Sequence, residues 1–579
     1  MNNISPYGFD AVIPLTNGAR MTSRGWDNFG SSLLRTRDRI SGVSDTMRYS
    51  ADLCSVLLDG VVTNSYELVN EMACTNLGSA IIKLYDKYGK NFPNYLRGNF
   101  CGFLVDESKK TTIIFTNHFG ARPIFYSQDR EGVLLISTDF ASLSRLLAEW
   151  GCTNTLDETA AYYLLSFGYM LDRRTLIAGA FKLNPGSVLV VQSGSFDMHR
   201  YYKYDNESRE MSERQAVDGF YERFMQAVAR GFKKDVEFGR RHISLLSGGL
   251  DSRLVIFAAH SLGFRDLLTL SFGQSGCYDV EIAKAISVDL RLDHLFLPLD
   301  GGDYLRDIAT PLYCNGGLII YSGAAHAVRA YSRMDWGALG LLHNGNLADI
   351  SHGDYVDDIK HTPPSAKFWA YSTRLLYKIA ENIEAEYKKY PNQESFAVHT
   401  RGINGIMNGS YSALPFCETD EPFMDVDLVD FCSKFPPVLK KGEKAFLMMI
   451  EKYFPKSTMY PWQRWGLRPT MRNYRLTSGF AYKVFKRLRL EYLAISHKKK
   501  PPRFDMNPMG HWIRTNKDLA SALLTRYQIL RRASECSEHL LRDCDAMASG
   551  DSPIELMQAL TFLEAEREFV LKQDRVVNK

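Results

Sequence analysis

The sequence predicts a mixed fold of the α/β plus α+β class, in which a β-rich first part precedes a parallel β-sheet flanked by helices. Three patterns support this. Up to about residue 200, short apolar segments rich in β-formers are separated by turn residues. From residue 216, apolar strands and helices alternate, which is typical of a parallel sheet covered on both faces. Beyond about residue 360 the pattern is mostly helical.

In the first part, apolar stretches bounded by turn residues predict strands, and apolar residues at helical spacing predict helices. Lys203–Glu213 is polar and is the best linker candidate. The expected strands are Leu53–Leu58, Phe100–Leu104, Thr112–Phe115, Val133–Ser137 and Ser187–Val191, and the expected helices are Leu77–Tyr88 and Thr159–Phe167.

In the second part, the alternation predicts one strand and one helix after another. We expect helix Ala216–Phe232, strand Ile243–Leu246, helix Ser252–Ser261, strand Leu267–Phe272, helix Val280–Asp289 and strand His294–Pro298. Helices Ser534–Ser549 and Ile554–Val570 close the chain. The domains expected from these patterns are residues 1–205, 212–470 and a helical extension, 471–579, packed on the second domain.

Composition excludes several classes of protein. The chain has 579 residues, of which 45% are hydrophobic and 23% charged, so it can bury more than one core. A net charge of +4 gives no electrostatic reason to bind nucleic acid. No apolar run approaches the roughly 20 residues of a membrane span, and the ten cysteines form no C-x-x-C pair. We therefore expect a cytoplasmic protein with free thiols, without a nucleic-acid or membrane partner.

The most specific motif is the loop Leu245-Leu246-Ser247-Gly248-Gly249-Leu250-Asp251-Ser252, which joins a buried strand to a helix. Glycines let the backbone approach an anion, and the free N–H groups of a helix start favour phosphate. Asp251 would repel a bare phosphate, so a Mg²⁺ ion between carboxylate and phosphates explains its presence. A plain turn between strand and helix is the alternative.

The pattern S-G-G-x-D-S after an apolar strand resembles the pyrophosphate loop of the ATP-pyrophosphatase family, and its surroundings resemble the asparagine-synthetase branch over roughly residues 55 to 470. That branch activates a carboxylate as an acyl-adenylate, releases diphosphate and couples the acyl group to an amine. The resemblance implies ATP and Mg²⁺ as cofactors. It places Ser247, Gly248, Gly249, Leu250 and Ser252 at the pyrophosphate and Asp251 at the metal.

Residues Asn344 to Tyr355 resemble the family segment S-G-E-G-x-D-E-x-x-G-G-Y, with matches at Gly345, Asp349, Gly353 and Tyr355. The match implies that Gly345 contacts the nucleotide and that Asp349 is a second metal or pyrophosphate contact. Taken alone, Asp349 is equally well a surface aspartate. Both family glutamates are replaced, by Asn346 and Ile350, which favours a substrate other than that of asparagine synthetase.

Residues Glu418 to Asp425 resemble E-x-R-x-P-F-L-D, and Trp462 to Leu467 resemble R-x-K-x-G-F. The family lysine that faces the reacting phosphate becomes Arg464, which keeps a permanent charge and would act by electrostatic clamping. Lys444 is either a second cation of the site or a solvated helix lysine. Asp420 and Trp462 stand where the family has arginines.

The nucleotide base is expected beyond the carboxyl ends of two parallel strands. In the family, adenine lies against the strand before the glycine loop and the end of the next strand. This implies contacts from Leu245, Leu246, Ser271, Phe272 and Gly273.

The front half resembles the glutaminase domain of asparagine synthetase, an N-terminal-nucleophile hydrolase-like αββα sandwich. Leu58 to Asn64 stand at N-G-E-I-Y-N, and Asn117 to Phe125 stand at D-x-x-G-x-x-P-L-Y. The glutamine-holding Asn and Glu are replaced by Asp59 and Val61, and Asn2 stands where the nucleophilic cysteine is needed. We therefore expect the fold to be kept and the domain to be inactive.

Taken together, these features predict an ATP-dependent, AMP- and diphosphate-forming amide ligase or cyclase of the carbon–nitrogen ligase class that does not hydrolyse glutamine. Relatives with the same loss include β-lactam synthetases, carbapenam synthetases and lasso-peptide cyclases, in which an amine of the same substrate closes a ring. The resemblance thus implies natural-product biosynthesis, antibiotics included, on a small molecule or peptide that carries a carboxylate and an amine, with a precursor peptide and a protease as candidate partners. Ammonia-dependent synthesis of asparagine or a sugar amide is the rival within this class. A degraded homologue used as a scaffold or binding protein is the rival from another class.

Residues Met471–Arg503 contain ten Lys or Arg and one acid. This segment is either a solvated helical face or a basic face for an acidic substrate, a peptide or a partner.

Overall fold

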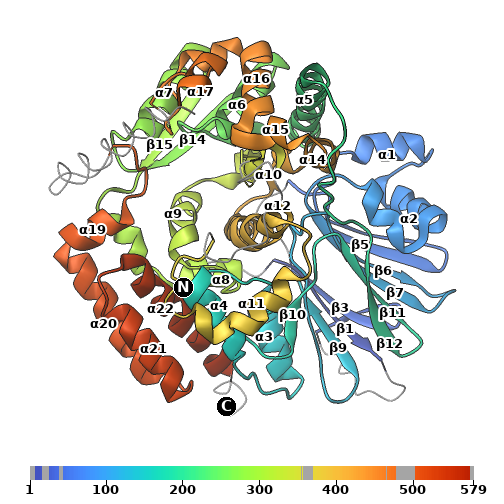
Figure 1. Cartoon of the computed structure of the whole chain (residues 1–579). Helices are drawn as coiled ribbons and strands as arrows, with labels where there is room; N and C mark the ends of the chain where they lie inside the picture. Colours follow the sequence, from blue (N-terminus) through green and yellow to red (C-terminus); the bar gives the residue numbers. More distant parts are fainter. Residues whose placement is uncertain are drawn as a thin grey trace.

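Three β-sheets organise the protein (Figure 1). The computed structural model describes residues 7–15, 25–37, 43–353, 355, 369–464, 466–477 and 503–573. Two antiparallel sheets form a sandwich from the first half of the chain, and one parallel sheet forms the centre of the second half.

The two antiparallel sheets pack face to face. The first has the order β10 (Ala180–Lys182), β8 (Phe125–Gln128), β9 (Val133–Ser137), β1 (Gly8–Pro14), β3 (Ser32–Arg37), β2 (Asp27–Phe29). The second has the order β12 (Ser195–Arg200), β11 (Ser187–Gln192), β7 (Thr111–Thr116), β6 (Phe100–Asp106), β5 (Cys54–Gly60), β4 (Met47–Ala51). Side chains such as Phe9, Phe103 and Ile114 fill the layer between them.

Helices cover the outer faces of the sandwich. α1 (Ser65–Glu71) and α2 (Leu77–Tyr88) lie on the second sheet, where Ile81 and Leu84 join its buried cluster. α3 (Phe140–Glu149) and α4 (Glu158–Phe167) lie on the first. Because each sheet is covered on both faces, strands such as β6 are apolar along their length and buried at every residue. The αββα arrangement predicted for this half is confirmed.

The third sheet is entirely parallel, with the order β15 (Asp293–Pro298), β14 (Leu267–Gly273), β13 (Arg241–Leu245), β16 (Leu339–His343), β17 (Thr419–Asp420). The chain order reverses between β13 and β16. In open parallel sheets ligands bind outside the carboxyl ends of the strands at such a reversal. Strand β16 is not among the elements that the sequence predicts, because it contains a glycine and none of the β-branched or aromatic residues that favour strands.

One face of this sheet packs against helices α5 (Glu213–Glu237), α6 (Asp251–Ser261) and α7 (Tyr278–Leu290), and α16 (Lys444–Tyr453) packs on α5. Its other face packs against α9 (Ser322–Tyr331). Helix α5 begins three residues before its predicted start because Ser212 and Gln215 form a reciprocal capping box.

The remaining helices connect the sheets and close the molecule. They are α8 (Ala309–Asn315), α10 (Ala348–His352), α11 (Ala380–Tyr387), α12 (Gln393–Ala397), a π-helix (Val398–Met407), α13 (Asn408–Ser410), α14 (Val426–Ser433), α15 (Pro437–Lys440), α17 (Met471–Thr477), α19 (Met509–Thr515), α20 (Lys517–Ala533), α21 (Glu538–Ala548) and α22 (Pro553–Ala565).

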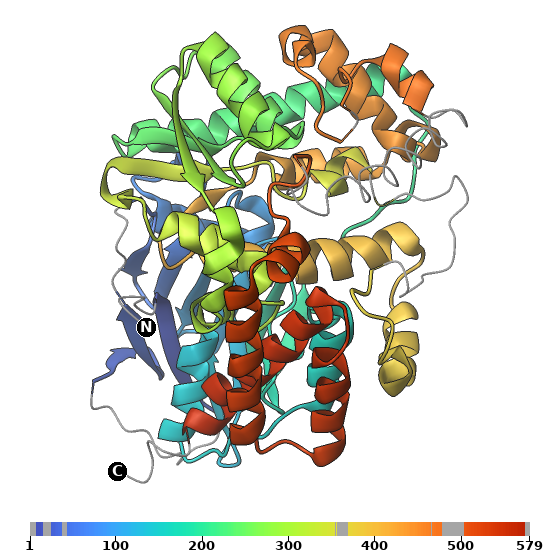
Figure 2. The same cartoon turned by 90° about the vertical axis from the view of Figure 1, so that its left-hand side faces the viewer.

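The C-terminal helices α19 to α22 form a layer beside the sandwich and the parallel sheet (Figure 2). Helix α22 packs against α4 of the first half and against α8 of the second. The extension therefore contacts both halves rather than the synthetase-like half alone. Most of the basic segment Met471–Arg503 lies outside the described residues, which here include only 471–477 and Arg503.

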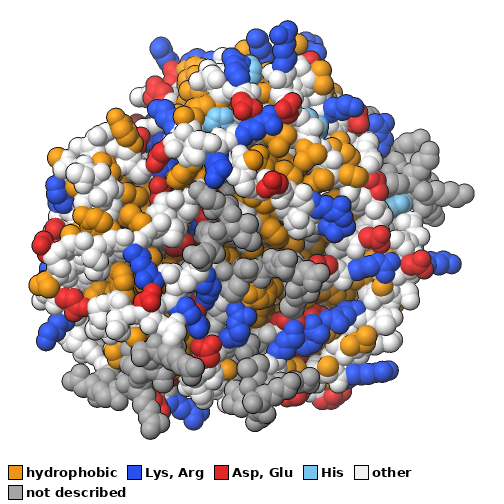
Figure 3. Space-filling model, turned by 180° about the vertical axis from the view of Figure 1, so that it is seen from behind, with side chains coloured by type: hydrophobic (Ala, Val, Ile, Leu, Met, Phe, Trp, Pro, Cys, Tyr) orange, Lys and Arg blue, Asp and Glu red, His pale blue; other side chains and the backbone are white. Residues whose placement is uncertain are grey.

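The visible back face of the molecule carries Lys, Arg, Asp and Glu side chains intermingled, without a broad area of one sign (Figure 3). Within the described part of the chain, no helix combines the length and the apolar character that a bilayer crossing requires. The described cysteines form no disulfide, and six of the ten are buried.

Candidate active site

The glycine loop joins β13 to α6 at the point where the strand order reverses. Hydrogen bonds to the hydroxyl groups of Ser247 and Ser252 fix the conformation of this loop. The N–H of Ser247 donates to Ser252 Oγ at 3.1 Å, and the N–H of Gly249 donates to Ser247 Oγ at 3.2 Å. A turn with two hydroxyls and several N–H groups at a helix start is suited to bind phosphate oxygens.

One N–H group of the loop already holds a carboxylate. Gly248 donates to Asp279 Oδ1 at 3.1 Å, and Asp279 lies in the first turn of α7. Burial raises the pKa of Asp279 to about 6, against the opposing effect of this hydrogen bond. The loop thus binds an anionic oxygen within the protein itself. Asp279 lies in no motif of the sequence, although its place in the segment that follows strand β14 is a usable signal.

Arg253 ties the loop to a distant segment. Its buried guanidinium donates to the carbonyl of Gly248 at 2.9 Å and to the carbonyls of Pro461 at 2.8 Å and Ser457 at 3.1 Å. The segment before Arg464 is therefore fixed to the backbone of the glycine loop.

The two predicted metal-binding aspartates converge. Asp251 Oδ1 and Asp349 Oδ1 lie 3.6 Å and 3.9 Å from the same atom, His352 Nε2. Burial lowers the pKa of His352, but Glu443, Asp251 and Asp349 outweigh it and raise that pKa to about 10. The imidazolium therefore partly offsets the charge of the acids. His352 falls at a variable position of the motif, three residues after Asp349, so the motif predicts no role for it.

Gly345 fixes this second segment against the glycine loop. A Cβ atom at Gly345 would lie 2.4 Å from the backbone nitrogen of Ser252 and 2.7 Å from Asp251 Cβ. No side chain fits there, so Gly345 contributes close backbone packing. Leu347 follows with a left-handed backbone, φ +63°, where the family has glycine.

The two predicted cations differ. Arg464 donates to Glu443 Oε1 at 2.6 Å, and Glu443 borders His352, so Arg464 belongs to the same cluster as the aspartates. Lys444 instead forms an ion pair of 2.5 Å with Glu213 at the start of α5. The structure thus does not bring Lys444 to the site. The first residue of α16 faces α5 rather than the loop.

The residues predicted to hold the base occupy different environments. Leu245 and Phe272 line a cavity at the carboxyl ends of β13 and β14. Leu246 and Leu250 point into the core beneath the sheet, and Ser271 Oγ donates to the carbonyl of Leu246 at 2.5 Å. Gly273 packs against the backbone of Met506. Only the first two side chains of this set therefore face the cavity.

This cavity has a volume of about 240 Å³ and lies between the parallel sheet, α9 and the π-helix. Asn346, which replaces a family glutamate, lines it and donates to Ser410 Oγ at 3.2 Å. Two charged side chains also line it, Arg401 of the π-helix and Glu421. Glu421 falls at a variable position of its motif and Arg401 lies in no motif, so the sequence alone assigns neither of them a role.

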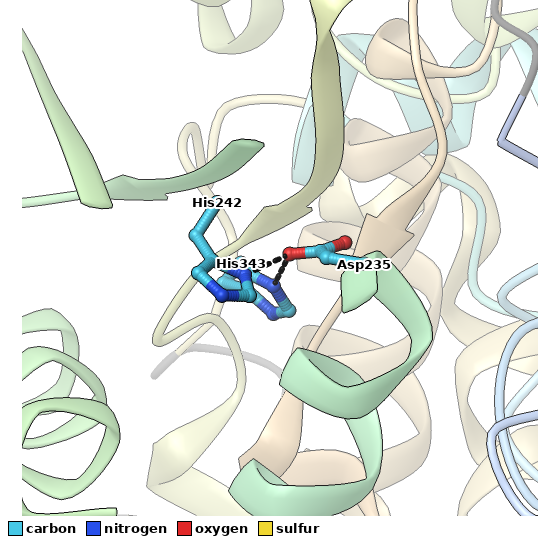
Figure 4. A group of neighbouring side chains, drawn as sticks. All are labelled: Asp235, His242 and His343. Carbon is cyan, nitrogen blue, oxygen red and sulfur yellow. Dashed lines mark hydrogen bonds and ion pairs between the residues drawn. The ribbon is translucent and has the colours of Figure 1, made fainter. Parts of the chain in front are cut away.

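A buried charged network lies behind the site (Figure 4). Asp235 Oδ2 lies 2.8 Å from a nitrogen of both His242 and His343, and the second nitrogen of His343 lies 2.8 Å from Asp420 Oδ2. Despite burial, the two carboxylates raise the pKa of His343 to about 9. Because the ring is bonded on both sides, this group is an ion-pair network rather than a metal site. Asp420, which stands where the family has an arginine, is thus paired with His343, the residue before Asn344.

The region of the front half where the resemblance places the glutamine pocket, here called the front pocket, contains a buried ion-pair network. Arg122 forms ion pairs with Asp59, at 3.3 Å, and with Glu418 of the synthetase-like half. All three side chains are at most 2% exposed. Asp59 stands where the resemblance places a glutamine-holding Asn, and its ion pair with Arg122 connects this region to the other half.

Two family models match this chain. The model described as a glutamine amidotransferase domain matches residues 36–202, and the model described as asparagine synthase matches residues 219–333. The pairing defines a class in which a glutaminase-type sandwich precedes a nucleotide-binding parallel sheet. Together with the asparagine synthetase relatives described next, these two matches support an asparagine synthetase-like family for this chain. The segments around Asp349, Glu421 and Arg464 lie beyond the matched residues.

Several curated proteins are similar over part of the chain. Amidase chry2 of Gibberella zeae is 27% identical over 220 residues, which are 36% of this chain and 28% of that protein. The glutamine-hydrolyzing asparagine synthetase of Triphysaria versicolor is 26% identical over 240 residues, 39% of this chain and 35% of that enzyme. The chain thus spans about a quarter to a third of the length of such relatives. A solved structure of the allosteric regulatory enzyme of purine biosynthesis covers 51% of this chain and 75% of its own, at 10% identity and a TM-score of 0.23.

Proposed function

We propose that this protein is an ATP-dependent amide ligase that converts a carboxylate into an acyl-adenylate and couples it to an amine. The observation that carries the proposal is the convergence of Asp251 and Asp349 on one point beside the glycine loop. A scaffold protein would gain nothing from two acids gathered next to an anion-binding turn.

Asp251 and Asp349 fit a magnesium ion. Both are carboxylates, the ligand type that Mg²⁺ prefers, and their side chains are 37% and 32% exposed, which leaves room for water ligands. A bound Mg²⁺ would offset the charge of the triphosphate. The N–H groups and hydroxyls of Ser247 to Ser252 would orient its phosphate oxygens. Arg464, held by Glu443, would stabilise charge on the leaving diphosphate.

We further propose that the enzyme works without hydrolysing glutamine. The support comes from the front pocket, where Asp59, Arg122 and Glu418 occupy a place that a glutamine amide would need. Breaking this network to admit a neutral ligand would leave buried charges without partners, which costs several kcal/mol. Free ammonia or an amine carried by the substrate would then be the nitrogen source. Natural-product lactam or macrocycle closure is the form of this chemistry that the loss of both family glutamates favours.

ATP–pyrophosphate exchange tests the proposal directly. The full-length protein with Mg²⁺ and ATP is screened against amino acids, dicarboxylic acids and peptides for transfer of labelled diphosphate into ATP. Exchange that depends on one acid, and that falls at least about 100-fold in Asp251→Asn, supports a ligase. The exposed Asp266→Asn is the matched control. Failure to bind the nucleotide at millimolar Mg·ATP, or binding unchanged in Asp251→Asn, contradicts the proposal and favours a scaffold.

A further inference from the structure

The cavity beyond the glycine loop contains two charged groups that have no partner of opposite charge among the residues that the structure describes. Glu421 and Arg401 both line this cavity, yet no ion pair joins either of them to another side chain there. Unpaired charges are costly to bury and are found where a ligand supplies the missing partner.

Glu421 comes from the segment that follows β17 and is 5% exposed. Both of its oxygens accept from amides, Oε1 from Asn344 at 3.0 Å and Oε2 from Asn99 at 2.6 Å. These amides fix its position without neutralising it, and burial raises its pKa. Glu418, the first residue of the same motif, is instead held by Arg122 away from this cavity. Glu421 is thus the acid of the motif that faces ligand space.

Arg401 lies on the π-helix Val398–Met407, a conformation that often marks functional sites. Its guanidinium donates to Tyr371 Oη at 2.9 Å and lies 5.5 Å and 6.0 Å from the ring centres of Tyr371 and Tyr169. Aromatic faces attract a cation but leave its remaining N–H donors unused. A planar fork of donors is suited to a carboxylate or a phosphate.

We propose that this cavity is the substrate site of the ligase and that its two charged groups select the two ends of the substrate. Glu421 binds the attacking group as an ammonium and takes its proton, and Arg401 binds an anionic group of the acid other than the carboxylate that reacts. This inference rests on the proposed function and specifies its substrates. It also assigns the front half a role, because Asn99 of that half fixes Glu421.

The coupling step balances with these groups alone. The ammonium loses one proton to Glu421, and the free amine attacks the acyl carbon. A carbon–nitrogen bond forms, the bond from that carbon to the phosphate oxygen of AMP breaks, and AMP leaves with the electron pair. The second nitrogen proton passes to water or to the phosphate of AMP, and Glu421 returns its proton to water.

Glu421→Gln separates the two half-reactions. With the acid identified by exchange, we expect adenylation to stay within about twofold, since the substitution is isosteric. Amide formation should fall about 100-fold, a typical contribution of a general base. Hydroxylamine, which is largely uncharged at neutral pH, should still yield the hydroxamate at the wild-type rate. Glu384→Gln on α11, where the acid is exposed and paired with Lys388, is the control.

Arg401→Gln tests the other group with acids that differ only in a distal carboxylate, phosphonate or uncharged carboxamide. The KM for the two anionic acids should rise at least about tenfold, equivalent to about 1.4 kcal/mol, while that for the carboxamide stays unchanged. Arg401→Lys should restore part of the preference. The carboxylate and phosphonate arms show which anion the site takes. Arg329→Gln, on α9 outside the cavity, is the control.

The outcomes are distinct. Loss of exchange, amide and hydroxamate in parallel assigns Glu421 a merely structural role and overturns the inference, as does amide formation within threefold of wild type. Equal KM changes for charged and uncharged acids in Arg401→Gln overturn the role of Arg401. If none of the screened acids supports exchange in the wild-type protein, the proposed function itself fails. If exchange occurs but both variants match wild type, only this inference fails.

Discussion

Two arginines show how the halves of this molecule differ. Arg122 in the front half lies between Asp59 and Glu418 and is 1% exposed. Arg401 in the second half is half-buried, lines a cavity and donates to Tyr371, and within the part of the chain that the structure describes it forms no ion pair with an acid. A cation whose charge is balanced within the fold stabilises a structure, whereas one left without an acid is available to a ligand. We therefore expect the front network to act as an interface between the halves and the second cavity to act as the binding site.

The same difference holds for the acids. Asp59 and Glu418 are neutralised across the boundary between the halves. Asp251 and Asp349 remain partly exposed beside a single imidazolium. The proposed function therefore places the added charge of a metal ion and phosphates at the glycine loop. The following substitutions test this contrast.

Arg122→Met should produce the largest effect on stability. It leaves Asp59 and Glu418 as buried charges without their cation, and we expect the free energy of unfolding to fall by about 3–5 kcal/mol. Urea denaturation measures this loss. Arg48→Met, which breaks an exposed pair with Asp27, should change stability by less than about 1 kcal/mol.

The triple variant Asp59→Asn, Arg122→Met, Glu418→Gln removes all three charges and should recover much of the loss. If Arg122→Met alone is as stable as wild type, the front pocket is not held by charge. The contrast between the halves would then fail.

Asp279→Asn tests whether the buried carboxylate bound by the glycine loop lowers the stability of the protein when it is ionised. Burial raises the folded-state pKa of Asp279 from 3.8 to about 6, so the native state binds a proton that the unfolded state has lost. Stability should therefore fall as the pH rises from about 4 to about 6, by up to about 3 kcal/mol, and stay lower above that range.

The Asn variant should lack this step and be more stable than wild type above pH 6. Unfolding measured from pH 4 to pH 8 for both proteins shows the difference. Glu281→Gln, an exposed acid on the same helix, should follow wild type. Parallel curves for wild type and Asp279→Asn would contradict a raised pKa.

The sequence predicts those parts of the fold whose signals are local. Helix Leu77–Tyr88 has the predicted bounds because Asn76 caps its start and Gly89 ends it with φ +56°. The strand, glycine loop and helix around Ser247 agree within two residues. In contrast, β17 has only two residues, and β16 (Leu339–His343) contains a glycine and no β-branched or aromatic residue that favours a strand.

The site was predictable where a motif places its residues and not where folding joins distant ones. Asp251 and Asp349 meet as their motifs imply. Arg122 and Glu418 are 296 residues apart, and Arg401 lies in no motif, so no local pattern predicts their environments. Lys444 lies in no motif, and its sequence context left it as either a second cation of the site or a solvated helix lysine. In the structure it lies on the face of α16 that turns it to Glu213.

Gly345→Ala should have the smallest effect on stability and a selective effect on ligand binding. The added methyl would lie 2.4 Å from the backbone nitrogen of Ser252, and this neighbour is main chain that cannot rotate away. Overpacking of this kind costs about 1–3 kcal/mol. Because the displaced atoms belong to the glycine loop, we expect the Kd for a non-hydrolysable Mg·ATP analogue to rise about tenfold, measured by calorimetry. Gly510→Ala in α19, where the nearest atom is the mobile end of Arg514 at 3.4 Å, should leave that Kd unchanged. Unchanged binding in Gly345→Ala would mean that the glycine loop does not hold the nucleotide. The contrast between the ion-paired front half and a ligand-binding second half would then fail.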